Sequence, residues 1–148
     1  MPSYRQIYYH IVFGTKYRKQ TIPESHCDIL YRYMAGIIKN KNCKPFQING
    51  APDHIHIMSD LHPSVALADY IKTIKVSSSI WMKDHPAFNQ FEGWADKYAA
   101  FTVSHKDRER VIEYIKRQKE HHGLVSFIDE FKTLLNQYGI EFDEKYLL

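Results

Sequence analysis

Two histidines separated by one residue are the strongest candidate for chemistry in the sequence. His54 and His56 lie in residues 53–61, a mostly apolar stretch that is typical of a strand. Successive side chains of a strand point to opposite faces, so both imidazoles project from one face and Ile55 from the other. Two such imidazoles can share a divalent metal ion if further side chains complete its coordination. A His-x-His pattern is weak evidence alone, because polar strand faces often carry histidines without a metal.

A tyrosine and a glutamine four residues apart form the second candidate. Tyr114 and Gln118 fall within a helix expected at residues 107–122, and residues at i and i+4 share one face of a helix. A phenol can act as a nucleophile, and an amide oxygen is a hard ligand for a metal ion. Taken alone, such a pair more often consists of a packing tyrosine and a solvated glutamine.

The segments that would position these residues follow a regular order. Alternating apolar residues predict strands at residues 4–15, 45–50, 53–61 and 98–104. Helical periodicity predicts a helix ending near Asn40, a second through Trp81, a third at 107–122 and a fourth through about Gln137. Each of the four helices follows a residue that could cap it: Thr21, Ser64, Ser104 and Ser126.

This order predicts an α+β fold of the ferredoxin-like type, with an antiparallel sheet (βαββαβ) and additional C-terminal helices. In that topology the first and third strands are central, which places His54 and His56 in the middle of the sheet. The first two helices cover one face, and the two extra helices cover the other face or form a partner interface. No linker or repeat interrupts the chain, so we expect residues 1–148 to form a single domain.

Composition excludes several classes of protein. With 148 residues, 44% of them hydrophobic, the chain can bury a core and is not expected to be disordered. No apolar run approaches the roughly 20 residues that a membrane span needs, and no secretory signal is indicated. Cys27 and Cys43 are too few for a disulfide framework. We therefore expect a soluble cytoplasmic protein without a membrane partner.

The charge distribution favours a polyanionic partner. Residues 1–122 contain 18 basic and 12 acidic residues, whereas residues 123–148 contain two basic and five acidic ones. A basic body with interleaved aromatic residues suits single-stranded nucleic acid, where bases stack on rings. Seven basic residues on the first strand's end and the second and third helices are candidate phosphate contacts: Lys16, Arg18, Lys72, Lys75, Arg110, Lys116 and Arg117.

The two candidate motifs together resemble a known family. A His-hydrophobic-His strand followed by Tyr-x-x-x-Gln on a basic helix is similar to the HUH single-tyrosine transposases of the insertion sequence 200/605 group. The similarity covers essentially the whole chain. It extends to the flanking segments HIVFGTKYR at 10–18, DHIH at 53–56, residues 72–78, Trp94, residues 111–122, and Glu130 with Leu134 and Leu135.

The resemblance implies a mechanism. Tyr114 would attack a scissile phosphate in single-stranded DNA, giving a 5′-phosphotyrosine and a free 3′-OH that can later reseal the strand. His54, His56 and Gln118 would hold Mg²⁺ or Mn²⁺, which polarises the phosphoryl oxygen. The family also implies a DNA substrate with hairpin ends, activity in a bacterial or archaeal cell at the nucleoid, and a homodimer.

The connection between the fourth strand and the third helix bears on how that dimer is built. Only Ser104 and His105 join the two elements. We expect this short connection to keep Tyr114 away from its own chain's histidines, so that the partner supplies it and the active sites are composite. The alternative is a monomer whose site is completed within one chain.

Three alternatives remain open. A domesticated HUH nickase acting on repeat elements would share the site and differ in its DNA substrate. A non-catalytic nucleic-acid-binding ferredoxin-like domain is disfavoured because the aromatic run of RNA-recognition domains is missing from the strands. A small metal-dependent hydrolase would need more carboxylates than Asp53 and Asp60. His121 and His122 are expected to cap the helix end rather than to bind metal.

Overall fold

The centre of the molecule is a four-stranded antiparallel sheet in the order β2-β3-β1-β4, as seen in a computed structural model that describes residues 3–147. The strands are β1 (Tyr8–Gly14), β2 (Pro45–Ala51), β3 (His54–Asp60) and β4 (Ala99–Val103). The expected α+β fold, with β1 and β3 central, is confirmed.

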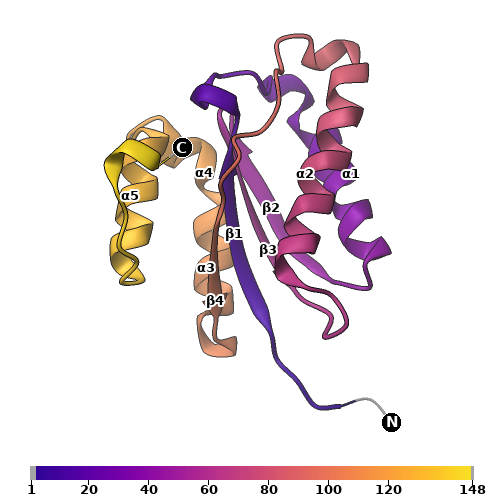
Figure 1. The fold of residues 1–148 in the computed structure, drawn as a ribbon, viewed down its shortest axis with the longest axis vertical. Helices are drawn as coiled ribbons and strands as arrows, with labels where there is room; N and C mark the ends of the chain where they lie inside the picture. Colours follow the sequence, from indigo (N-terminus) through magenta and orange to yellow (C-terminus); the bar gives the residue numbers. More distant parts are fainter. Residues whose placement is uncertain (1–2, 148) are drawn as a thin grey trace.

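Helices cover both faces of the sheet (Figure 1). On one face lie α1 (Cys27–Asn40) and α2 (Leu67–Asp84); on the other lie α3 (Arg108–Lys116), α4 (Gln118–His122) and α5 (Phe127–Gln137). Residues 3–147 also contain five short 3-10 helices: η1 (Lys16–Arg18), η2 (Glu24–His26), η3 (Pro86–Phe88), η4 (His105–Asp107) and η5 (Glu144–Tyr146). Within the described residues, no helix is both long and apolar enough to span a bilayer.

The two central strands orient the histidines. In the β1–β3 ladder, Gly14 pairs with His54 and Val12 with His56. The alternate side chains of both strands, among them Ile55 and Ile57, enter the apolar core against α1 and α2. His54 and His56 consequently face α3, α4 and α5, as the strand alternation predicts.

The turn between β2 and β3 is tight and holds Asp53 next to His54. Ala51 pairs with His54, so only Pro52 and Asp53 connect the strands. A Cβ on Gly50 would lie 2.2 Å from the His54 carbonyl oxygen, so the close approach of the two strands requires glycine there.

Three of the four expected helix caps are wrong. The helix expected to begin near Thr21 begins at Cys27, because the backbone N–H groups of residues 21 and 22 donate to the Pro52 carbonyl and tie this segment to the β2–β3 turn. Ser64 bonds the His62 ring instead of capping α2. Ser104 bonds the Asp107 side chain, and the turn that follows is η4. Ser126 does cap α5, accepting from the Asp129 N–H.

The helix expected at 107–122 is interrupted. α3 ends at Lys116 and α4 begins at Gln118. The Asn49 side chain of β2 donates to the carbonyls of Ile115 and Lys116, at 3.0 and 3.1 Å. These bonds satisfy carbonyl groups that a continuing helix would have used, which accounts for the break.

Candidate active site

The four residues of the two sequence motifs converge on one face of the sheet. His54 and His56 project from β3, Tyr114 comes from the last turn of α3, and Gln118 begins α4. The His54 Nε2 atom lies 2.8 Å from the Gln118 Oε1 atom. The Tyr114 and His56 rings are 5.8 Å apart between centroids.

A fifth residue, Glu130 of α5, stands at the centre of this group. Its Oε1 atom lies 3.3 Å from the Nε2 atoms of both His54 and His56. Its Oε2 atom accepts hydrogen bonds from the Tyr114 hydroxyl and, at 2.8 Å, from the Gln118 amide. The side chain is only 3% exposed, so the carboxylate is held by these partners rather than by water.

Two further side chains orient the histidine rings. The Asp53 carboxylate lies 2.7 Å from the Nδ1 atom of His54, and His10 Nε2 lies 2.8 Å from the Nδ1 atom of His56. The Nε2 atom of each ring is thereby directed at Glu130. Partners on the second ring nitrogen are the usual support of metal-binding histidines, because they set the tautomer and the ring orientation.

The arrangement fits a divalent metal ion. One atom each from His54, His56 and Glu130 lies within 4.8 Å of the others. Adjacent ligands held about 2.1 Å from one ion lie about 3 Å apart, close to the separations of Glu130 Oε1 from the two rings. Two imidazoles, a carboxylate and an amide oxygen form a plausible ligand set for such an ion.

The electrostatics of the group follow from burial and pairing. Burial lowers the pKa of His54, but its bonds to Asp53, Glu130 and Gln118 outweigh it and raise the pKa to about 9. For His56, burial and the neighbouring charges of His54 and His121 prevail over Glu130 and lower the pKa to about 4. Burial raises the pKa of Glu130, yet the hydrogen bonds from the histidines and Tyr114 hold it well below its usual range.

The same surroundings keep the nucleophile candidate protonated. Burial, and then the hydrogen bond to Glu130, raise the pKa of the Tyr114 hydroxyl above its ordinary value. A phenol in this state needs a proton acceptor in order to attack, and the Glu130 carboxylate is already in contact with it.

α5 closes the site. The Phe127 ring lies flat on the His54 ring, with centroids 4.1 Å apart and planes at 4°. This approach depends on Gly14, because a Cβ there would lie 2.7 Å from the Phe127 Cε2 atom. His54, His56 and Gln118 are each at most 1% exposed. These three side chains are therefore shielded from solvent, and α5 forms part of the cover.

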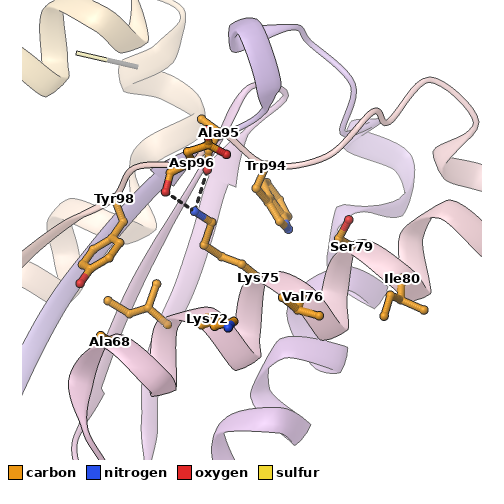
Figure 2. A pocket seen from close by; sticks show the side chains of 11 residues that line it. Ala68, Lys72, Lys75, Val76, Ser79, Ile80, Trp94, Ala95, Asp96 and Tyr98 are labelled. Atoms are coloured by element: carbon orange, nitrogen blue, oxygen red, sulfur yellow. Dashed lines mark hydrogen bonds between the residues drawn. The ribbon is translucent and has the colours of Figure 1, made fainter. Parts of the chain in front are cut away.

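The predicted DNA-contact residues fall on opposite sides of the molecule. Lys75 donates to the carbonyls of Ala95 and Asp96, at 2.6 and 3.2 Å, so it ties the segment before β4 to α2 (Figure 2). Lys72 and Lys75 line a hollow along α2, and Lys16 and Arg18 lie in η1. The other three candidates lie at or just after α3: Arg110 pairs with Asp107, Lys116 pairs with Glu113, and Arg117 is at the helix break.

The expectation that a short connection keeps Tyr114 from its own histidines is wrong. After β4, η4 turns the chain so that α3 packs across β2 and β3 of the same chain. Tyr114 therefore meets the His56 ring within a single chain.

Sequence reasoning missed Glu130 and His10 as members of the site, although both left a signal. Glu130 falls on the apolar face of α5 with Phe127, Phe131 and Leu134, where a carboxylate needs a buried partner. His10 lies in β1 and projects from the same face of the sheet as His56 of β3. His121, expected only to cap a helix, has its Nε2 atom 3.4 Å from the Glu130 carboxylate.

Comparison with known proteins agrees with this geometry. The family described as "Transposase IS200 like" matches residues 3–118. The ISDra2 transposase TnpA of Deinococcus radiodurans is 26% identical over 122 residues, which cover 78% of this chain and 86% of that protein. The transposase for insertion sequence element IS200 of Salmonella typhimurium is 26% identical over 117 residues, covering 76% of each.

Solved structures show the same fold. A crystal structure of a putative transposase from Deinococcus radiodurans superposes with a TM-score of 0.59 at 24% identity, covering 80% of this chain and 96% of that one. A REP-associated tyrosine transposase bound to a REP hairpin superposes with a TM-score of 0.62 at 13% identity, covering 96% and 89%. Because the family match includes both histidines, Tyr114 and Gln118, we conclude that the chain belongs to the IS200-like transposase family.

Proposed function

We propose that this transposase cleaves and rejoins single-stranded DNA at insertion-sequence ends through a covalent 5′-phosphotyrosine on Tyr114. The observation that carries the proposal is the contact between the Tyr114 hydroxyl and a buried cluster of two histidines and a carboxylate. In the cleavage step the phenolic oxygen forms a bond to phosphorus, and the bond from phosphorus to the 3′-oxygen breaks. The 3′-oxygen takes up a proton from solvent water and leaves as a hydroxyl group.

The same cluster provides a metal site of three strong ligands and one weaker ligand. His54 and His56 would each bind through Nε2, Glu130 through Oε1, and Gln118 through its amide oxygen. Bound Mg²⁺ or Mn²⁺ would polarise the phosphoryl oxygen and offset its developing charge. The mixed nitrogen and oxygen set suits Mn²⁺ at least as well as Mg²⁺.

Glu130 has a second task in this proposal. Its Oε2 atom accepts from the Tyr114 hydroxyl while Oε1 faces the histidines. The carboxylate is thus placed to take the phenolic proton as the oxygen attacks and to return it when the strand is resealed. Glu130 lies beyond residues 3–118, the part of the chain that matches the family, so this contribution comes from the C-terminal helix.

A homodimer remains a proposal that rests on the family. Composite sites are not required by this geometry, because Tyr114 already lies beside its own histidines. Mixing the Tyr114→Phe chain with a His54→Ala/His56→Ala chain distinguishes the two arrangements. In a composite dimer the mixture regains DNA cleavage, with the adduct on the chain that lacks the histidines. In a single-chain site the mixture stays inactive although heterodimers form.

The decisive experiment is a denaturing gel of protein incubated with labelled single-stranded DNA and Mn²⁺. We expect a covalent adduct on hairpin-ended DNA taken from the flanks of the gene. The Tyr114→Phe chain keeps the ring and should fold and bind DNA but form no adduct. An adduct with Tyr114→Phe would refute the assignment of the nucleophile. Adduct formation on repeat-element hairpins but not on flanking ends would instead identify a nickase acting on repeats.

A further inference from the structure

A basic and aromatic hollow lies beside the turn that follows β1. It has a volume of about 560 Å³ and lies between η1, the C-terminal end of α2, residues 92–97 and η5. Six of its lining residues carry a positive charge or an aromatic ring: Lys16, Tyr17, Lys83, Lys97, Lys145 and Tyr146. The apolar and catalytic clusters described above use none of these six side chains.

The charge of the hollow is positive. Four lysines line it together with two acidic residues, Glu92 and Asp96. The Glu92 carboxylate is paired at 3.1 Å with Lys19, the residue that follows η1. The lysine charges are therefore only partly offset, and a polyanion would find a favourable potential there.

Two exposed tyrosines flank these charges. Tyr17 is 72% exposed and Tyr146 is 65% exposed, so neither ring contributes to a core. Lys16 lies 5.6 Å from the centroid of the Tyr17 ring, and Lys97 lies 5.2 Å from that of Tyr146. Exposed rings beside lysines are the pattern on which unpaired bases stack while their phosphates meet the charges.

The backbone that holds Tyr17 in this position is strained. Tyr17 and Arg18 both have positive φ angles, 59° and 55°, which residues with a side chain rarely adopt. Hydrogen bonds hold the turn in place: among them, the Lys16 N–H donates to the Gly93 carbonyl at 2.9 Å, and the Thr15 hydroxyl donates to the Lys19 carbonyl at 2.6 Å. Backbone strain of this kind persists where the surroundings over-determine it, and ligand-binding sites are a common place for it.

The hollow and the candidate active site lie at the same end of the sheet. Gly14, the last residue of β1, pairs with His54, and the Thr15 N–H donates to the Asp53 carbonyl. The hollow adjoins a second hollow along α2 (Figure 2), with which it shares four lining residues: Ser79, Trp94, Ala95 and Asp96. Lys72 and Lys75 line this second hollow, so basic side chains continue from the first hollow along α2.

We propose that this hollow binds single-stranded DNA, with unpaired bases stacked on Tyr17 and Tyr146 and phosphates held by Lys16 and Lys83. The inference rests on the proposed function, because the bound segment would be the single-stranded DNA adjoining the cleaved bond. It goes beyond that function in assigning the recognition of unpaired bases to residues outside the metal and tyrosine cluster.

The test measures binding without cleavage. Fluorescence anisotropy of a labelled oligothymidine is recorded with the Tyr114→Phe chain in EDTA, so the result does not depend on metal or adduct formation. Tyr17→Leu and Tyr146→Leu should each weaken binding at least about fivefold, whereas Tyr17→Phe and Tyr146→Phe should stay within about twofold of the parent. Tyr4→Leu, at a tyrosine that is 98% exposed elsewhere, is the matched control.

Charge is tested separately from stacking. Lys16→Gln with Lys83→Gln should make the affinity less dependent on salt, while Lys39→Gln on α1 should have a smaller effect. Equal losses in the leucine and phenylalanine variants, or equal losses on a blunt duplex of the same length, would overturn the stacking proposal. If the adduct assay fails but this pattern holds, the function is wrong and the hollow still binds single strands. If the adduct assay succeeds but this binding pattern is absent, the proposed function stands and only the role assigned to the hollow is wrong.

Discussion

The two faces of the sheet are built from the same strands but bury different kinds of side chain. Toward α1 and α2, the strands bury one continuous apolar cluster that includes Ile11, Phe13, Ile55 and Ile57. Toward α3, α4 and α5, the apolar contacts are divided into two clusters, one around Phe131 and one around Ile115. The histidines, Gln118 and Glu130 fill the space between the two.

This difference assigns stability mainly to one face of the sheet and the candidate chemistry to the other. Burying a polar group is costly unless it is hydrogen-bonded, so the polar cluster is kept only with every member paired. The apolar face supplies the stabilising burial that lets the other face hold such a group. Substitutions toward α3, α4 and α5 should consequently reduce activity, whereas substitutions toward α1 and α2 should reduce stability, even at adjacent residues of one strand.

The sharpest test uses the neighbours His56 and Ile57, which are both 0% exposed and point to opposite faces. His56→Ala should reduce adduct formation by at least about 100-fold, because it removes a metal ligand. Ile57→Ala should cost about 2–5 kcal/mol of unfolding free energy through the cavity it leaves. Its folded fraction should still form adduct at the parental rate. Denaturant titrations and adduct gels on both variants check the pair, and an Ile57→Ala chain that is folded but inactive would contradict the separation.

Glu130→Gln tests the contribution of the C-terminal helix. The substitution keeps the shape and removes the charge, so Mn²⁺ affinity should fall about 10- to 100-fold, as measured by calorimetry. Glu120→Gln, at an exposed position of α4, is the matched control and should leave the affinity unchanged. Unaltered Mn²⁺ binding by Glu130→Gln would show that Glu130 pairs with the histidines only when the metal is absent.

Gln118→Ala should have a smaller effect than either change above. A neutral amide is a weaker ligand than imidazole or carboxylate, so we expect roughly a fivefold loss of Mn²⁺ affinity. Adduct formation should fall but remain measurable at saturating metal. A loss as complete as that of His56→Ala would mean that Gln118 also positions Tyr114 through Glu130, to which both donate.

The smallest predicted effect concerns pH and the metal-free protein. The folded-state pKa of His54 is about 9, whereas an exposed histidine titrates near 6.5. Its proton therefore stabilises the fold fully below about pH 6.5, and this contribution is lost as the pH rises through about 9. In EDTA, the melting temperature of the parent should fall between pH 7 and 9.5 by about 5 °C more than that of His54→Gln. Parallel curves for the two chains would contradict the assignment.

Much of the fold followed from local patterns in the sequence. Strand alternation placed His54 and His56 on one face and Ile55 and Ile57 on the other, because a two-residue period leaves no alternative. The βαββαβ order and the Ser126 cap were also predicted correctly. The caps at Thr21 and Ser64 were not, because backbone bonds to distant Pro52 and a local bond to His62 took precedence over the capping pattern.

The sequence by itself determined which residues could do chemistry and which strand face would carry the histidines. Only the tertiary structure decided how the site is completed. Glu130 is 74 residues from His56, and its contact with that ring depends on how α5 docks on β1 and β4. The break after Lys116 likewise depends on Asn49, a residue of another element. Local periodicity carries no information on such contacts, because they arise from packing between elements far apart in the chain.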